Sequence, residues 1–168
     1  FRMDPDNPVI KPNLISPQNE FHVPGTTPQP WEIADVPHGV LHQHFYKSAV
    51  VGDQRDYYVY TPPDYDVNRK TKYPVLYLLH GYSDDASGWT SVGQANVILD
   101  NLIAQGKAKP MIIVMTLGYG APEMLLKKWN AGQDKELHDR NLTKFREALL
   151  TEVIPQIEKL YRVSNKPQ

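Results

Sequence analysis

Residues 75–89 read VLYLLHGYSDDASGW, an apolar run of five residues followed by His80-Gly81 and a polar loop. The run Val75–Leu79 has no polar break, which is the pattern of a strand buried on both faces in a parallel sheet. In open α/β sheets, ligands bind in the loops just beyond the carboxyl ends of the strands. This stretch therefore predicts an α/β fold and a candidate site in the loop that starts at His80.

Three further strands are predicted on either side of this stretch. Residues 40–48 and 55–61 show strand patterns and are joined by Gly52-Asp53, a hairpin turn signal. Residues 111–115 form a second continuous apolar run, which predicts another buried parallel strand. The sheet should therefore have a parallel core and antiparallel leading strands.

Two helices are predicted from apolar residues at helical spacing. The first spans residues 94–105, with Gly106 as its C-cap, and the second spans about 141–161. Pro155 lies inside the second helix and should kink it. Alternating strands and helices predict an α/β layered fold, and the sheet is expected to be incomplete because no strand follows the last helix.

The amino-terminal region is rich in proline. Eight of the 15 prolines fall within the first 37 residues, and each removes a backbone donor and fixes φ. This region should therefore run extended over a surface rather than form a helix or a central strand.

The bulk composition excludes several classes of protein. The chain has 168 residues, a net charge of −1 and no cysteine, which fits one compact domain without disulfides or thiolate metal sites. We expect no nucleic-acid partner, no membrane span and no cofactor. His42 and His44 would share one face of a strand, but no third ligand has a suitable spacing, so no metal site is predicted.

The loop after Leu79 is the strongest candidate for chemistry. Gly81 would let the backbone approach a substrate and present its N–H groups to a developing negative charge. The alternative is an ordinary strand-to-helix turn in which His80 caps the strand. Trp89 is expected to anchor the loop by packing, with a substrate platform as the alternative.

Five segments carry a resemblance to a known family: RDYYVYTPPDY (55–65), YPVLYLLHG (73–81), NVILDNLI (96–103), KPMIIVM (109–115) and EVIPQIE (152–158). In order and spacing they resemble the carbohydrate esterases that include feruloyl esterases, within the esterase D-like group of α/β-hydrolases. The resemblance covers about residues 37–163. Acetyl esterases such as acetyl xylan esterases, S-formylglutathione hydrolases and mycolyltransferases share parts of the pattern, so they stay open as alternatives.

The resemblance implies roles for four residues near the carboxyl edge of the sheet. The backbone N–H of Tyr82 would be one donor to the tetrahedral intermediate of ester cleavage. Gly81, the Tyr82 side chain, Trp89 and Tyr119 would contact the substrate, with Tyr119 lining an aromatic acyl pocket. For Tyr119 the alternative is a loop residue that packs on the surface.

The resemblance also suggests how the chain is divided. Residues 1–22 resemble the tail of an amino-terminal β-sandwich module similar to carbohydrate-binding modules. Residues 23–38 would be a Pro-rich linker, and residues 39–168 the amino-terminal half of an α/β-hydrolase esterase domain. The whole is thus expected to be an incomplete α/β-hydrolase sheet preceded by an extended segment.

The nucleophile motif of the family, G-x-S-x-G, is absent from the 168 residues. The expected parent is a serine esterase that releases hydroxycinnamates from plant cell-wall polysaccharide, secreted or periplasmic, with feruloylated arabinoxylan or small hydroxycinnamoyl esters as substrates. Its nucleophile, acid and base would lie in a missing carboxyl-terminal half, and this chain alone is expected to be inactive. The alternative from another class is a non-catalytic binding or interaction module.

Overall fold

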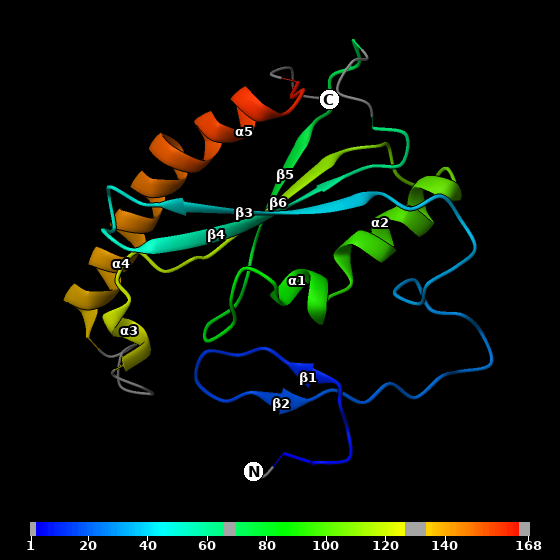
Figure 1. Ribbon diagram of the computed structural model, residues 1–168, viewed down its shortest axis with the longest axis horizontal. Coiled ribbons are helices and arrows are strands. Elements are labelled where there is room, and N and C mark those ends of the chain that lie inside the picture. Colours follow the sequence, from blue (N-terminus) through cyan, green and yellow to red (C-terminus); the bar gives the residue numbers. More distant parts are fainter. Residues whose placement is uncertain (1–2, 66–69, 127–133, 165–168) are drawn as a thin grey trace.

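The computed structural model describes residues 3–65, 70–126 and 134–164. At its centre is a four-stranded sheet in the order β3-β4-β6-β5 (Figure 1). The strands are β3 (Val40–Lys47), β4 (Gln54–Thr61), β5 (Val75–Leu79) and β6 (Ile112–Thr116). The pairs β3–β4 and β4–β6 are antiparallel, and β5–β6 is parallel. This confirms the predicted α/β class with antiparallel leading strands and a parallel core.

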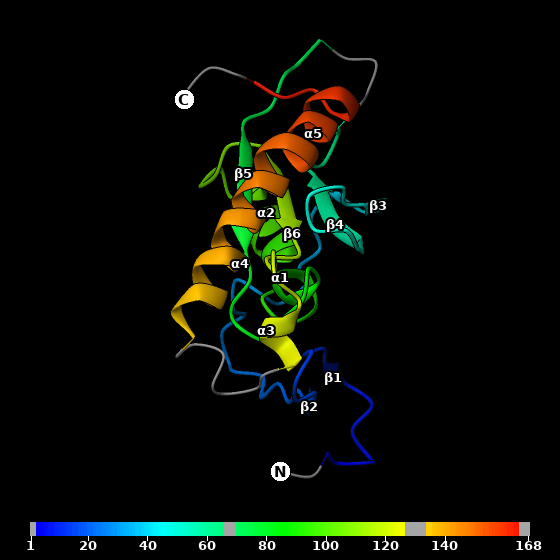
Figure 2. The same cartoon turned by 90° about the vertical axis from the view of Figure 1, so that its left-hand side faces the viewer.

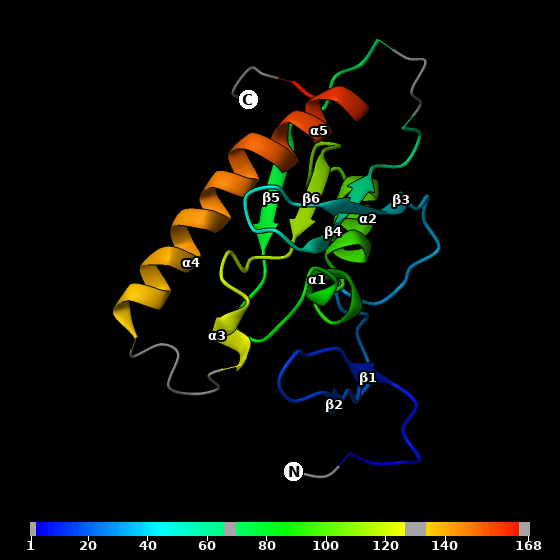
Figure 3. The ribbon, with the colours of Figure 1, turned by 60° about the vertical axis from the view of Figure 1, so that its left-hand side comes forward.

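The central strand β6 is buried along its whole length, and its side chains alternate between two layers of helix. Ile112 and Val114 belong to one core cluster, together with Ile157 of helix α5 (Ile154–Leu160). Ile113 and Met115 belong to another, which includes Leu99 of helix α2 (Ala95–Ala104). The period of two in a strand thus puts α2 and α5 on opposite faces of the sheet (Figures 2 and 3).

Strand β5 corrects one expectation. It lies at the edge of the sheet, and Leu76 and Leu79 are 43% and 44% exposed. The apolar run was interpreted as a strand buried on both faces, which holds for β6 but not for β5 within the described residues. Along most of its length, β5 pairs with a strand on one side only. Its side chains therefore have fewer neighbours to bury them than those of β6.

The hairpin of β3 and β4 begins and ends within one residue of the predicted positions. Gly52, in the connecting loop, has φ of 93°, a conformation that glycine adopts without steric cost. The loop is held from a distance by Glu152, whose carboxylate accepts from the Ser48 hydroxyl at 2.7 Å and from the Ala49 and Val50 amides at 2.7 and 3.1 Å.

The last helical run differs from the prediction in its start and in its proline. It begins at Lys135 rather than near Asn141 and consists of α4 (Lys135–Ala148), a π-helical turn η2 (Leu149–Val153) and α5. The Asp134 side chain caps the start by accepting from the Leu137 amide at 3.0 Å. Pro155 lies in the first turn of α5, separated from the end of η2 by Ile154, where its missing N–H costs little within that helix.

After α5 the chain returns to the edge of the sheet. Val163 forms a parallel bridge with Tyr73, just before β5. The Tyr73 amide donates to Arg162 O at 2.9 Å, and the Ser164 amide donates to Tyr73 O at 2.7 Å. Residues 162–164 thus pair with the chain just before β5 through this single bridge, but no strand follows α5 within the described residues, as expected for an incomplete sheet. Residues 165–168 lie outside the described ranges.

The amino-terminal region is extended, as predicted, and contains one short hairpin of β1 (Ile10–Lys11) and β2 (Gln18–Asn19). Further along, the proposed linker packs on α2, where the Asn101 side chain donates to Pro30 O and Glu32 O at 2.9 Å each. Phe1 and Arg2 are not among the described residues. In the part of the chain that is described, no helix has the length and apolar character needed to cross a bilayer.

Candidate functional site

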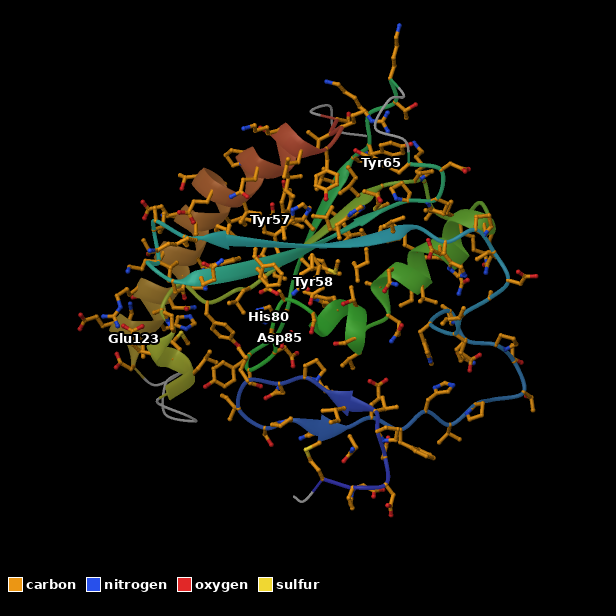
Figure 4. All side chains as sticks on the ribbon, in the orientation of Figure 1. Tyr57, Tyr58, Tyr65, His80, Asp85 and Glu123 are labelled. Atoms are coloured by element: carbon orange, nitrogen blue, oxygen red, sulfur yellow. The ribbon has the colours of Figure 1, made fainter. Side chains whose placement is uncertain are left out.

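The candidate site lies where β5 and β6 end. Their parallel register pairs Leu79 with Thr116, so the loops that follow the two strands leave the sheet at the same edge. The first loop leads to the short helix α1 (Gly88–Ser91) and the second to α3 (Glu123–Leu126). Figure 4 shows His80 and Asp85 of the first loop between the sheet and the amino-terminal hairpin.

His80 ties the two loops together. Its Nε2 accepts from the Gly118 amide at 2.8 Å, which fixes the proton on Nδ1, and Nδ1 then donates to Gly81 O at 2.7 Å. Both ring nitrogens are therefore occupied by backbone groups. His80 therefore connects the loops after β5 and β6, where the alternative interpretation had it only capping the end of one strand. Its role is structural and not that of a general base.

The turn after His80 is held in a demanding conformation. The Asp84 amide donates to Gly81 O at 3.3 Å, and Ser83 has φ of 69°. A residue with a Cβ in this left-handed region carries strain on the order of 1 kcal/mol and needs its surroundings to hold it there. Tyr82, inside the turn, has a half-exposed side chain at 48%. The strained residue thus directly follows the predicted oxyanion donor.

Trp89 stabilises the carboxyl-terminal end of the loop after β5. Its indole N–H donates to Leu79 O at 2.8 Å, which joins α1 to the end of β5. A Cβ on Gly93 would lie 2.7 Å from the Trp89 ring, so the next turn of chain packs closely against it. The side chain is 36% exposed, and these contacts fit the packing anchor better than the substrate platform.

The loop after β6 is fixed from both sides. Asn141 of α4 accepts from the Gly120 and Ala121 amides at 2.9 and 3.0 Å. The buried Arg55 side chain of β4 donates to Tyr119 O. A Cβ on Gly120 would come within 2.3 Å of backbone atoms of α4, so only glycine fits at this position. Sequence reasoning missed Arg55 because nothing in its strand pattern indicated a buried cation.

Tyr119 is buried, with 4% exposure, which rules out the alternative of a residue packing on the surface. Burial raises the pKa of its hydroxyl to about 12, so the group stays protonated near neutral pH. It lines a cavity of about 380 Å³ together with Leu14, Tyr58, Asp85 and Ser87. Cavities that hold small molecules measure roughly 300–1,000 Å³.

Tyr82 lines a different cavity, also of about 380 Å³, whose other walls include Lys11, Ile15 and Gln18. Tyr82 and Tyr119, the two predicted substrate contacts, therefore lie at the same edge of the sheet but line separate cavities. Both cavities are bordered by the amino-terminal loop between β1 and β2.

That amino-terminal loop is the main feature that sequence reasoning missed. The Leu14 amide donates to Ser83 O at 2.7 Å. The Asn13 side-chain amide donates to Ser83 Oγ at 2.8 Å and to Asp84 Oδ1 at 3.1 Å. The only available signal was Pro12-Asn13, which favours a turn but says nothing about what the turn contacts.

The two strand histidines are used in packing. The His44 ring stacks on Tyr57 with centroids 4.9 Å apart, and its Nε2 lies 2.6 Å from the Tyr161 hydroxyl. Burial, with a smaller effect of nearby His42, lowers the pKa of His44. No group of three side chains suited to holding a metal occurs within residues 3–65, 70–126 and 134–164.

The sheet order, its two helical layers and the glycine-containing loop at the carboxyl end of β5 define the chain as part of an α/β-hydrolase. Residues 48–167 match the family described as "Putative esterase", and the chain belongs to this esterase family.

Individual relatives point the same way. The chain is 34% identical over 128 residues to an endo-1,4-beta-xylanase/feruloyl esterase of Xylanibacter ruminicola, a match that covers 74% of this chain and 16% of the relative. A ferulic acid esterase structure from the anaerobic fungus Anaeromyces mucronatus superposes with a TM-score of 0.66 and 25% identity, covering 86% of this chain and 53% of that one. A second ferulic acid esterase structure has a TM-score of 0.57 and 30% identity, covering 76% and 46%.

The fold is shared more widely. An enterochelin esterase structure from Shigella flexneri has a TM-score of 0.65 at 19% identity and covers 98% of this chain and 37% of its own. This chain therefore spans about half or less of each of these relatives.

Proposed function

We propose that the protein to which this chain belongs is a serine carboxylic-ester hydrolase that releases hydroxycinnamates from plant cell-wall polysaccharide. Membership of the esterase family supports ester chemistry, and the names of the relatives at 25–34% identity support a feruloyl ester as the substrate. The substrates would be feruloylated arabinoxylan or small hydroxycinnamoyl esters, which implies a secreted or periplasmic enzyme.

One observation carries the proposal. The loop after β5 places a half-exposed Tyr82 and a left-handed Ser83 at the carboxyl edge of the parallel strands. In α/β-hydrolases, this loop supplies one backbone N–H of the oxyanion hole and the residue after the nucleophile supplies the other. The Tyr82 amide would donate to the oxyanion as the carbonyl carbon becomes tetrahedral, which lowers the barrier because the donor is already in place.

The remaining chemistry would follow the serine esterase scheme. A serine hydroxyl attacks the ester carbonyl while a histidine accepts its proton, the sugar alcohol leaves with that proton, and water then hydrolyses the acyl-enzyme. The sequence contains no G-x-S-x-G motif, and His80 has both nitrogens engaged with the backbone. We therefore place the nucleophile, the acid and the base in a further part of the protein and expect the 168-residue chain alone to be inactive.

The contacts with the acyl group are assigned to aromatic residues at the same edge. Tyr119, which lines a cavity together with Tyr58, would contribute to an aromatic acyl pocket, while Gly81 and the Tyr82 side chain would border the ester carbonyl. Trp89 would act on the substrate only through the loop that it anchors.

The test combines a probe with a substrate. The 168-residue chain and a longer chain that includes the proposed catalytic part are each treated with a fluorophosphonate and with methyl ferulate, and intact mass is recorded before and after. We expect labelling and ferulate release from the longer protein only. Release by the isolated chain would overturn the assignment of the nucleophile, and an unlabelled, inactive longer protein would favour a non-catalytic module.

A further inference from the structure

The loop between β1 and β2 lies against the loop after β5, although about 70 residues separate them in sequence (Figure 3). Their contact includes three hydrogen bonds and one ion pair. Asn13 donates to Ser83 Oγ and Asp84 Oδ1, the Leu14 amide donates to Ser83 O, and Lys11 Nζ lies 3.7 Å from Asp84 Oδ1. All of these contacts fall on the two residues that follow Tyr82.

Asn13 is the centre of this contact because it is itself held rigidly. Its side-chain oxygen accepts from the Ile15 and Ser16 amides at 3.0 and 2.9 Å, which closes a turn of the kind that asparagine favours. Its amide nitrogen then points at Ser83 and Asp84. The Asn13 side chain thus stabilises the amino-terminal loop through its oxygen and binds the loop after β5 through its nitrogen.

The residue that Asn13 contacts, Ser83, has a strained backbone conformation. Ser83, with φ of 69°, lacks the freedom of glycine and needs outside contacts to remain left-handed. Asn13 and Leu14 bind its hydroxyl and its carbonyl, at 2.8 and 2.7 Å. Tyr82 and Ser83 lie in one turn, closed by the bond from the Asp84 amide to Gly81 O, so contacts that hold Ser83 also restrain the turn that carries the Tyr82 amide.

We propose that Asn13 is a positioning residue of the ester site, which holds Ser83 left-handed and so directs the Tyr82 N–H toward the oxyanion. This inference rests on the proposed function of Tyr82. It also gives the amino-terminal hairpin a part in catalysis rather than the role of a tail from another module.

The first test needs no activity. Amide hydrogen exchange over residues 81–86 is measured in the 168-residue chain for wild type, Asn13→Ala, Asn13→Asp and Asn7→Ala. Asn13→Asp keeps the oxygen that closes the turn but sets a carboxylate against Asp84. The Asn7 side chain donates to Glu20 O and accepts from the Val9 amide, away from Ser83 and Asp84, and Asn7→Ala serves as the matched control. We expect exchange at least tenfold faster in both Asn13 variants and unchanged in Asn7→Ala.

The second test uses the longer, active protein with methyl ferulate. Since losing an oxyanion donor costs about 10²–10³ in rate, a misdirected donor should lower kcat by about 10- to 100-fold in both Asn13 variants, with KM within about twofold. Asn7→Ala should keep the wild-type kcat even if its melting temperature falls.

The outcomes separate the two proposals. A wild-type protein without esterase activity would defeat the proposed function, while exchange would still report whether Asn13 orders the loop. An active wild type in which Asn13→Asp keeps its kcat, or equal exchange in all four proteins, would overturn the positioning role alone.

Discussion

The hydroxyl of Tyr60 donates to the carboxylate of Asp100 at 2.5 Å, and this bond joins the sheet to helix α2. Asp100 is 2% exposed and also accepts from the Gly39 amide at 2.9 Å and lies 3.0 Å from His38 Nδ1. One buried carboxylate therefore fixes the entry to β3, the end of β4 and the helix that follows the candidate site. Burial, with Asp100 adding to it, raises the pKa of Tyr60.

Asp100→Asn should destabilise the fold, because the Tyr60 hydroxyl and the Gly39 amide would then donate to a neutral amide oxygen instead of a carboxylate, which is the stronger acceptor. We expect a loss of about 1–3 kcal/mol in the free energy of unfolding, measured by urea denaturation. Tyr60→Phe removes a single bond and should cost less. Equal stability of wild type and Asp100→Asn would show that the three bonds contribute nothing net.

Glu152 provides a second long-range prediction, since its carboxylate holds three donors of the β3–β4 loop. Glu152→Ala should leave the Ala49 and Val50 amides without their partner and lower the free energy of unfolding by about 1–3 kcal/mol. Faster amide exchange should be confined to residues 48–52. Glu147→Ala, an exposed site on the same helical run, is the control and should behave as wild type.

These contacts mark the limit of what could be predicted from the sequence. The strands, α2 with Gly106 at φ 66° and the edge of the sheet that carries the site followed from local patterns. The bonds of Asp100, Glu152 and Asn13 join residues 40 to 104 positions apart. A carboxylate or amide has no local signature of its distant partner, so such contacts are outside the reach of periodicity.

The same reason explains why the exposure of β5 and the early start of α4 differ from the prediction. The apolar run of β5 resembles that of β6, and only the sheet order shows which of them has neighbours on both sides. The early start of α4 depends on the Asp134 cap, in a stretch where charged residues outnumber apolar ones and weaken the helical periodicity.

His44 predicts a pH dependence of stability. Its pKa is lowered in the folded state, chiefly by burial, so the unfolded chain binds a proton more readily. The stabilisation is therefore fully present above the unfolded pKa of about 6.5 and is lost as pH falls from there toward the lower folded value. The slope from this single group cannot exceed about 1.4 kcal/mol per pH unit.

The measurement is the difference in unfolding free energy between wild type and His44→Gln from pH 7.5 to pH 4.5, which cancels the titration of other groups. We expect wild type to lose stability relative to the variant across this interval. A flat difference for His44→Gln would contradict the direction of the shift.

The role of the Tyr82 amide is tested by two substitutions, of which one keeps the backbone N–H donor at position 82 and the other removes it. Tyr82→Ala keeps the backbone N–H, and Tyr82→Pro removes it. In the longer, active protein, Tyr82→Pro should lower kcat for methyl ferulate by about 10²–10³ relative to Tyr82→Ala, because the oxyanion loses a donor while the loss of the half-exposed ring is common to both. Melting temperatures and fluorophosphonate labelling of both variants exclude unfolding as the cause.

If the two variants hydrolyse the ester equally fast, the oxyanion donor is not the Tyr82 amide. Asn13 would then order a loop that does not take part in the chemistry.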